Sequence, residues 1–332
     1  MVRRLGLALT VLGLVASPAW AGGGTDDYFA RLAAAAKQSV DEVVAARPPK
    51  LVPPVPRPVA WKAVRLGSLD LGAPLVAMTA ADLDGDGKAE LYAVTTREVI
   101  AIGIARGKVT ELGRVAFGGD PAMPASRDPV GTAVVDKGEL VASASAWDSD
   151  LRVSWQGKKL VGTVGVAGSL VCPGERLVRV PGRNHFGDVA QPLYGVRCRA
   201  DLVDPMGALL HLRATLMGAK LEVVIERCGV TGSCLPVAKH EYKDYGSTFE
   251  IADVDRDGKP EVIVSGAGAP GDPDAIKVMT LGGDEKKGLF RRTFKGGVVG
   301  IAVGDGDGDG GVEVIAAVRL AGGMNVDLWR LD

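Results

Sequence analysis

The sequence predicts an all-β protein that repeats one small sheet unit around a ring. From residue 59 onward, short runs of Val, Ile, Leu, Ala and Thr are separated by Gly, Asp and Pro every five to ten residues. This is the pattern of strands and turns, and no long helical periodicity appears after residue 60. An acidic nine-residue pattern recurs three times, each time directly before an apolar run. Radial repetition leaves a sheet domain of this size with few exposed edges.

Composition places the chain among folded proteins and argues against a nucleic-acid surface. Of its 332 residues, 47% are hydrophobic and 24% are charged, which suffices for a sizeable core. The 39 Lys and Arg residues balance 40 Asp and Glu residues, so the formal net charge is −1. A broad nucleic-acid interface needs a basic stripe, and we therefore expect no nucleic-acid partner.

The first 21 residues have the organisation of a secretory signal peptide. Arg3 and Arg4 precede an apolar run over residues 5–16, and Ala-Trp-Ala at 19–21 is a small-residue cleavage site. The apolar run is shorter than a typical membrane-spanning helix, and no later stretch is long and apolar enough to be one. We predict a signal peptide at 1–21, export to the periplasm or extracellular space, and no membrane span after cleavage.

A helix and a linker are predicted between the signal peptide and the sheet domain. Thr25 can cap a helix within residues 22–46, and two Asp residues follow it in the first turn, where the helix dipole favours them. Residues 47–58 contain six prolines and are predicted to form an extended linker. The sheet domain then occupies residues 59–332. The helix either docks on a partner or lies on the sheet domain, and both interpretations stay open.

The cysteines predict disulfide bonds if the protein is exported. Cys228 and Cys234 flank a sequence typical of a hairpin tip. Of the three possible connectivities we therefore expect Cys228–Cys234 together with Cys172–Cys198. A zinc site is the alternative, but the chain has no CxxC pair and only three His residues.

The pattern D-x-D-x-D-G-x-x-E predicts a metal site in each of its three copies, at residues 82–90, 253–261 and 305–313. Four carboxylates in one tight loop repel one another, and a hard cation relieves that repulsion. Ca²⁺ accepts six to eight oxygen ligands in flexible geometry, whereas Mg²⁺ demands a strict octahedron and dehydrates reluctantly. We therefore expect three Ca²⁺ ions.

The expected ligands are the carboxylates at loop positions 1, 3, 5 and 9 and the backbone carbonyl at position 7, with Gly at position 6 making the sharp turn. In the three loops these are Asp82, Asp84, Asp86, Lys88 and Glu90; Asp253, Asp255, Asp257, Lys259 and Glu261; and Asp305, Asp307, Asp309, Gly311 and Glu313.

Two other interpretations of the pattern are less favourable. A helical EF-hand needs Glu at position 12, where this chain has Ala93, Val264 and Ala316, and its flanking segments would be helices rather than strands. Polar turns without metal would not require three copies that all end in Glu directly before a strand.

The loops and their following strands resemble the FG-GAP (or VCBS) repeats of integrin α-chain β-propellers. Residues 263–271 read Ile-Val-Ser-Gly-Ala-Gly-Ala-Pro-Gly, which is similar to the family's strand followed by Gly-Ala-Pro-Gly, and Phe117-Gly118-Gly119 resembles the other half of the name. The resemblance implies a propeller of four-stranded blades, with each calcium loop joining the first two strands of a blade. Residues 125–240 lack the acidic loop, so blades there would be metal-free.

Loop spacing agrees with this architecture. Asp253 and Asp305 are 52 residues apart, and Asp82 and Asp253 are 171 apart, or four steps of about 43 residues. Counting strands gives six blades, and a seventh is possible around 180–215. The expected blades are 75–117, 130–164, 168–200, 208–240, 246–294 and 297–331, the last completed by Val59–Leu69.

The sequence favours a binding protein over an enzyme. His185 and Asp188 form one conceivable His–Asp pair in a glycine-flanked loop, whereas His211 and His240 fall in predicted strands. We expect a non-enzymatic, calcium-binding module of the cell envelope with a protein or glycan ligand. A hydrolase or lyase on a propeller scaffold and a structural envelope protein assembling through its N-terminal helix are the alternatives. Neither the ligand nor the oligomeric state is specified by these patterns.

Overall fold

The structure is a computed structural model, and it describes residues 29–30, 32–38, 55–180, 182, 194–203, 209–218, 220–228, 234–266, 272–320 and 324–332. The chain divides into two compact units, Met1–Pro49 and Lys50–Asp332. In the first unit, residues 29–30 and 32–38 are helical, within the range predicted for the N-terminal helix. The predicted signal peptide lies outside the described residues. Within the described part of the chain, no helix has the length and apolarity needed to cross a bilayer.

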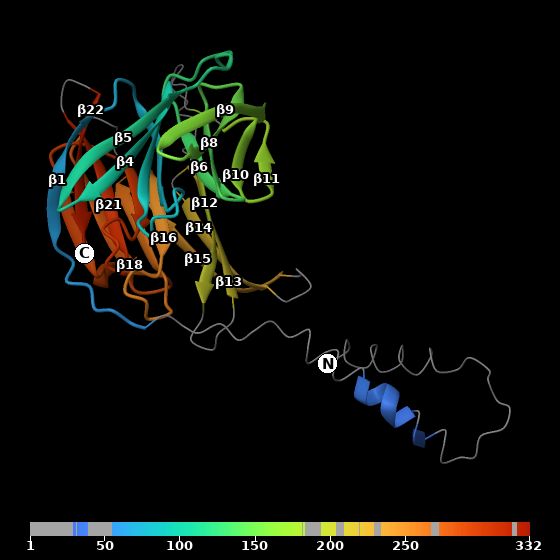
Figure 1. Ribbon diagram of the computed structural model, residues 1–332. Helices are drawn as coiled ribbons and strands as arrows, with labels where there is room; N and C mark the ends of the chain where they lie inside the picture. The colour runs from blue at the N-terminus through green and yellow to red at the C-terminus, as the bar shows by residue number, and fades with distance from the viewer. Residues whose placement is uncertain are drawn as a thin grey trace. The chain divides into compact units, whose positions relative to one another are not determined.

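The second unit is a closed ring of antiparallel sheets (Figure 1). Among the described residues, five sheets have four strands and one has two. The first strands of neighbouring sheets contact one another in the order β2, β6, β10, β12, β16 and β20, and β20 contacts β2 again. This arrangement is a β-propeller and confirms the predicted fold class. Residues 55–62, from the predicted linker into the start of the domain, have no regular secondary structure.

Within four of the four-stranded blades, the strands follow chain order from the axis outward. They are β2 (Leu75–Ala81), β3 (Glu90–Thr95), β4 (Glu98–Ala105) and β5 (Lys108–Ala116); β6 (Gly131–Asp136), β7 (Glu139–Ala144), β8 (Ser149–Gln156) and β9 (Lys159–Ala167); β12 (Tyr194–Val203), β13 (Leu209–Met217), β14 (Lys220–Cys228) and β15 (Cys234–Lys243); and β16 (Tyr245–Ala252), β17 (Glu261–Gly266), β18 (Asp274–Thr280) and β19 (Phe290–Phe294). A single 3₁₀ turn, η1 (Glu285–Lys287), lies between β18 and β19.

The fifth four-stranded blade closes the ring. It consists of β20 (Val298–Gly304), β21 (Glu313–Arg319) and β22 (Asn325–Leu331) with β1 (Ala63–Asp70) as the outer strand. β1 pairs antiparallel with β22 from Ala63 opposite Leu331 to Asp70 opposite Asn325. Figure 1 shows the blue N-terminal strand of the ring beside the red C-terminal ones. The expectation that residues near 59–69 complete the last blade is therefore confirmed.

The two-stranded sheet differs from the blade expected at 168–200. It contains β10 (Ser169–Cys172) and β11 (Glu175–Leu177). β12 does not join it, because its pairing partner is β13 in the next blade. Both β12 and β13 fall in the region where a seventh blade was possible, so the described residues show no seventh sheet.

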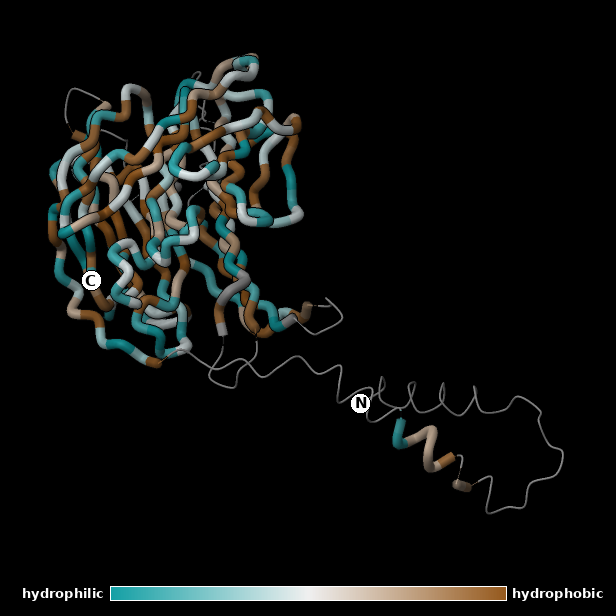
Figure 2. The backbone as a smooth tube through the Cα atoms, viewed as in Figure 1, coloured by the Kyte–Doolittle hydropathy of each residue, from teal (hydrophilic) through white to brown (hydrophobic). Residues whose placement is uncertain are grey.

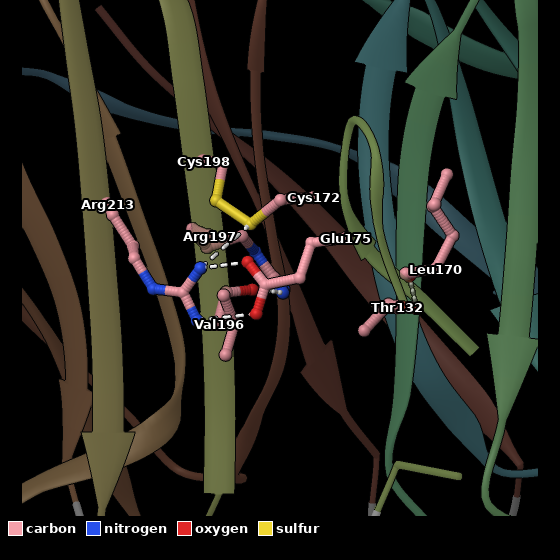
Figure 3. The surroundings of a disulfide bond; sticks show 8 residues. All are labelled: Thr132, Leu170, Cys172, Glu175, Val196, Arg197, Cys198 and Arg213. Carbon is pink, nitrogen blue, oxygen red and sulfur yellow. Dashed lines mark hydrogen bonds and ion pairs between the residues drawn. A yellow bond between two sulfur atoms is a disulfide. The ribbon is translucent and has the colours of Figure 1, made fainter. Parts of the chain in front are cut away.

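Polar and covalent links hold this small sheet between its larger neighbours. On one side, the Cys172–Cys198 disulfide joins β10 to β12, with the two Cα atoms 5.6 Å apart, and Arg213 forms an ion pair with Glu175 (Figure 3). On the other side, the Thr132 hydroxyl donates to the Leu170 carbonyl at 2.7 Å. Arg176 also donates to the fully buried Asp150 of β8 at 2.6 Å. A sheet too small to bury much apolar area is thus fixed by specific bonds.

The second predicted disulfide involves a hairpin tip. Cys234 is disulfide-bonded, and Cys228 is its neighbour across the ladder between β14 and β15. The side chain of Cys228 lies outside the described residues.

Hydrophobic cores lie between blades rather than in one central mass. Each of four large clusters combines side chains from two neighbouring sheets. The second strands β3 and β21 are almost entirely buried, because blades cover both of their faces, whereas the outer strand β5 is mostly exposed. Figure 2 shows hydrophobic residues concentrated along the strands of the ring. This explains why second strands appear as continuous apolar runs in the sequence.

Removing the Cys172–Cys198 bond should destabilise the propeller more than removing the neighbouring ion pair. The bond closes a separation of 26 residues, so the Cys172→Ser/Cys198→Ser variant should lose about 3 kcal/mol of unfolding free energy in urea. Arg213→Ala is the control and should cost less than about 1 kcal/mol, because its ion pair is substantially exposed. An unfolding free energy unchanged by the double substitution would contradict the assigned role of the disulfide.

Candidate metal centre

The three acidic loops occupy equivalent places in three blades. Loop 1 (Asp82–Glu90) joins β2 to β3, loop 2 (Asp253–Glu261) joins β16 to β17, and loop 3 (Asp305–Glu313) joins β20 to β21. In each, the Glu at position 9 is also the first residue of the second strand. The three blades are consecutive in the ring, and the blade closed by β1 stands in the middle.

The same hydrogen bonds fold every loop. The backbone N–H of position 6 donates to the Asp at position 1, that of position 5 to the Asp at position 3, and that of position 7 to the Asp at position 5, all at 2.6–3.2 Å. The N–H of position 2 donates to the Glu at position 9 at 2.8–3.2 Å. These bonds curl nine residues around their own carboxylates.

Left-handed backbone conformation at positions 4 and 6 makes this curl possible. Position 6 is Gly in all three loops, with φ between 80° and 89°. Position 4 is Gly85 and Gly308 in loops 1 and 3, but it is Arg256, with φ 58°, in loop 2. L-residues other than Gly enter this region at a cost of about 1–2 kcal/mol, so loop 2 adopts the shared geometry despite its residue at position 4.

Eleven of the twelve loop carboxylates converge. In loops 1 and 3, one oxygen from each of the four carboxylates lies within 4.8 Å of the others. In loop 2, the converging residues are Asp253, Asp255 and Glu261. Asp257 lies outside this group, and its Oδ2 is 3.4 Å from Lys259 Nζ. Coordination by the carbonyls of position 7 stays a prediction.

Loop 2 contains a buried carboxylate oxygen without a hydrogen-bond partner among the described residues. Asp253 Oδ2 accepts the Gly258 N–H at 2.9 Å, but Asp253 Oδ1 is buried and has no hydrogen-bond partner among the described residues. Burying an oxygen anion without a partner is costly. A metal ion bound among these carboxylates would satisfy this atom.

The glutamates at position 9 are buried at the base of each loop. Glu90 and Glu313 are 4% exposed and Glu261 is 1% exposed. Burial, reinforced by the neighbouring carboxylates, raises the pKa of Glu261 to about 8 and that of Glu313 to about 7. Burial likewise raises the pKa of Glu90. A cation favours the ionised carboxylates and would reverse these shifts.

Glu90 is also tied to the neighbouring blade. The Tyr92 hydroxyl donates to Glu90 Oε2 at 2.8 Å and accepts from Trp155 Nε1 of β8 at 2.8 Å. Tyr92 is fully buried, so this chain of bonds fixes the orientation of the glutamate. Loop 1 is thereby coupled to the packing between two blades.

The loops differ in the basic side chains around them. In loop 3, Arg57 binds Asp309 through two hydrogen bonds of 2.9 and 3.0 Å, and Arg330 donates to Asp307 Oδ2 at 3.0 Å. The hydrogen bond with Arg57 holds the pKa of Asp309 below its usual value. Loop 1 forms no ion pair with Lys or Arg in the part of the chain that is described.

Backbone bonds connect the three loops to one another. The Ala89 N–H of loop 1 donates to the Asp305 carbonyl of loop 3 at 2.7 Å. The Arg57 N–H donates to the Asp255 carbonyl of loop 2 at 2.7 Å, while its side chain binds loop 3. The candidate metal centres therefore form one connected group around the closing blade.

The donor set suits a hard divalent cation. Carboxylate and carbonyl oxygens are the only ligands these loops offer, and such oxygen ligands suit Ca²⁺, Mg²⁺ or Mn²⁺. Clusters of three or four carboxylates, partly exposed, suit the flexible coordination of Ca²⁺, whereas Mg²⁺ would demand a strict octahedron. The residues therefore fit the Ca²⁺ ions that the sequence predicts.

Two of the three histidines lie in strands of the described structure. His185 and Asp188 lie outside the described residues, so their proposed pair stays a prediction. His211 is in β13, with Nδ1 4.0 Å from the Sγ of Cys234, and His240 is in β15. Both therefore fall in strands, as predicted.

A cavity lies on the axis of the ring, away from the acidic loops. A cavity of about 370 Å³ is lined by the beginnings of β2, β6, β12, β16 and β20. The acidic loops follow the opposite ends of β2, β16 and β20, so the cavity and the loops lie at opposite ends of the inner strands. Its charged lining residues are Arg127, Asp128, Arg197, Asp274 and Arg319.

The residues outside the loops that bind the loop carboxylates were not identified from the sequence. Arg57 lies in the predicted linker and Arg330 in the last strand, both distant in sequence from the carboxylates they bind. One signal was available, because position 7 is Lys in loops 1 and 2 but Gly311 in loop 3. Tyr92 was likewise indistinguishable from an ordinary core aromatic residue.

Comparisons with known proteins identify no family for this chain. No protein-family model and no curated protein matches the sequence. Among solved structures, the PQQ-bound aldose sugar dehydrogenase from Streptomyces coelicolor is similar with 11% identity and a TM-score of 0.39, over 84% of this chain and 100% of that chain. The Photorhabdus luminescens Tc holotoxin pore is similar with 12% identity and a TM-score of 0.34, over 82% of this chain and 14% of that chain. Similarity at this level supports no functional inference, and the fold assignment rests on the sheets themselves.

Introducing Gly at position 4 of loop 2 and removing it at position 4 of loop 1 should change the unfolding free energy in opposite directions. Arg256→Gly should raise the unfolding free energy by roughly 0.5–1 kcal/mol, because Gly adopts positive φ without steric cost. Gly85→Ala should lower it by about 1 kcal/mol or more for the same reason; a Cβ at Gly85 would meet nothing within 4 Å, so packing would not contribute. Urea unfolding in chelator measures both values, and equal signs for the two variants would contradict the shared loop geometry.

In chelator, the protein should become less stable as pH rises from about 5 to 8. The pKa of Glu261 is raised to about 8 and that of Glu313 to about 7 in the folded state, against about 4.3 when unfolded. Their stabilising contribution is fully present below the unfolded pKa and is lost as pH rises through the folded values, a change on the order of a few kcal/mol for each glutamate.

Urea titrations at pH 5, 6.5 and 8 measure this slope. Glu261→Gln/Glu313→Gln keeps the side-chain oxygens that accept the position-2 N–H groups and should flatten the slope. Asp309, which is paired with Arg57, has a lowered pKa and acts at lower pH. A slope that the double substitution leaves unchanged would contradict the assignment.

Proposed function

We propose that this protein is an exported, non-enzymatic, calcium-binding β-propeller that serves as a protein- or glycan-binding module of the cell envelope. The observation that carries the proposal is the repetition of one hydrogen-bonded loop scaffold in three consecutive blades, with converging carboxylates in each. Three copies of the same oxygen-rich arrangement are far more specific than one acidic turn. They also agree with the resemblance to FG-GAP or VCBS calcium loops.

The role proposed for Ca²⁺ is structural. Each ion would neutralise carboxylates at the junction between the first and second strands of a blade. Because the three blades surround the closing pair β1 and β22, calcium would stabilise the part of the ring where the two ends of the domain meet. Binding to the folded state alone stabilises it by RT ln(1 + [Ca²⁺]/Kd), which is about 1.4 kcal/mol per site at ten times Kd.

The proposed location follows from two features. The signal-peptide pattern predicts export, and the Cys172–Cys198 bond is the kind of link that persists in an oxidising compartment. Extracellular calcium modules typically bind with Kd values of about 10⁻⁴ to 10⁻³ M, so loops of this type would be filled outside the cytoplasm. The axial cavity is the proposed place for a ligand, because pockets with a few convergent charged groups are the usual sites of recognition.

Calcium should raise the melting temperature of the purified, oxidised protein by several degrees. At 2 mM Ca²⁺ the shift should appear in circular dichroism melts, whereas equal Mg²⁺ should give little and EDTA should remove it, because Ca²⁺ accepts flexible coordination and Mg²⁺ demands a strict octahedron. The Asp84→Ala/Asp255→Ala/Asp307→Ala variant should lose the shift.

The matched control for this melt is Asp120→Ala/Asp136→Ala/Asp272→Ala, which removes three carboxylates outside the loops. This variant should keep the full calcium response. A wild-type melting temperature indifferent to Ca²⁺ would overturn the proposed function, and an equal loss of response in both triple variants would show that the loops are not the sites.

A further inference from the structure

We propose that Arg57 sets the calcium affinity of loop 3, acting as an internal cation that Ca²⁺ must displace from Asp309. This inference rests on the proposed calcium function and deepens it. It assigns an affinity-determining role to a residue of the proline-rich segment, outside the acidic pattern. It also predicts that the three loops are unequal, with loop 3 binding more weakly than loop 1.

The contact between Arg57 and loop 3 is bidentate. Arg57 Nη1 donates to Asp309 Oδ1 at 3.0 Å, and Nη2 donates to Asp309 Oδ2 at 2.9 Å. Nη1 is also 3.3 Å from the Asp309 carbonyl oxygen. Parallel bonds of this kind are the preferred geometry between guanidinium and carboxylate. Both oxygens of the position-5 ligand are therefore engaged by one positive charge.

The backbone around Arg57 holds the side chain ready for this contact. Pro56 and Pro58 flank it, and a residue before proline is restricted to extended conformations. The Arg57 N–H donates to the Asp255 carbonyl of loop 2 at 2.7 Å. The residue is thus anchored on loop 2 through its backbone while its guanidinium reaches loop 3, which reduces the entropy lost in forming the pair.

Loop 3 departs from the other loops at the position that faces this guanidinium. Position 7 is Lys88 in loop 1 and Lys259 in loop 2, but Gly311 in loop 3. A Cβ atom at Gly311 would lie 2.9 Å from Arg57 Nη1, so any side chain there would crowd the guanidinium. Gly311 therefore leaves the space that the Arg57 guanidinium occupies. This explains why loop 3 has Gly at position 7, where the other two loops have Lys.

The balance of charge ranks the loops. Loop 3 has four carboxylates with Arg57 on Asp309 and Arg330 on Asp307. Loop 1 also has four, with no Lys or Arg paired to them among the described residues. Calcium affinity depends on the net charge of the ligand set, so the arginines should weaken loop 3. The Arg57 and Asp309 side chains are 48% and 52% exposed, and exposed pairs are weak, so Ca²⁺ is able to displace the guanidinium.

The linkage also operates in the opposite direction. If Arg57 opposes calcium binding at loop 3, calcium binding there must weaken the hold of Arg57 on Asp309 by the same factor. The attachment of this segment to loop 3 would then depend on calcium, while its backbone bond to loop 2 persists.

The test measures Ca²⁺ binding by equilibrium dialysis with radioactive calcium on the purified full chain at constant pH and ionic strength. An Asp84→Asn/Asp255→Asn background disables loops 1 and 2 and isolates loop 3. In that background, Arg57→Ala should raise the affinity about twofold to fivefold, because it removes one exposed bidentate ion pair. In the otherwise wild-type chain, the same substitution should strengthen one of the weaker binding steps and leave the tightest unchanged, which covers the case in which the background variant does not fold.

The matched control is Arg65→Ala. Arg65 forms a comparable bidentate pair with Asp327, at 2.8 and 2.9 Å, and its side chain is 50% exposed. It joins β1 to β22 without touching a loop carboxylate, so calcium affinity should not change. Affinity at loop 3 that Arg57→Ala leaves equal or lowers would overturn this inference while the calcium function stands. No calcium binding at any loop of the wild-type protein would overturn both.

Discussion

Antiparallel pairing of β1 with β22 is the constraint on which the rest of the propeller depends. The closing blade buries both of its faces against its neighbours, so a ring left open there would expose two apolar faces at once. The two strands come from opposite ends of the domain, and their pairing registers all seven residues from Leu331 back to Asn325. Loss of this pairing would therefore affect cores well beyond the closing blade.

The acidic loops lie in the part of the ring that the pairing of β1 with β22 closes. They belong to the closing blade and the blade on each side of it, and the bonds from Ala89 to Asp305 and from Arg57 to Asp255 connect them. Their repeated curl brings carboxylates together against Coulomb repulsion, in an arrangement that could hold a cation. Loop 3 already recruits two from the protein itself, in Arg57 and Arg330. The neutralisation of the loop carboxylates and the closure of the ring thus take place in the same region of the protein.

Local patterns predicted most of the fold and the core of the site. Alternation and turn residues located the blades, and the D-x-D-x-D-G-x-x-E spacing located three loops in which eleven carboxylates converge. The extent of the third blade was not predictable, because the pairing of β12 with β13 depends on strand partners rather than on local sequence. Asp257 also matches the pattern, yet it lies beside Lys259 and outside its cluster.

The sequence by itself determined what depends on neighbours along the chain: strand segments, the left-handed glycines at position 6, and the ligand spacing within each loop. Tertiary structure alone decided what depends on partners distant in sequence. It set the residue-by-residue register of β1 against β22, fixed Glu90 through Tyr92 and Trp155, and brought Arg57 onto Asp309. The physical reason is that turn and ligand geometry follow from a few adjacent dihedral angles, whereas burial and ion pairing arise only after the blades have packed.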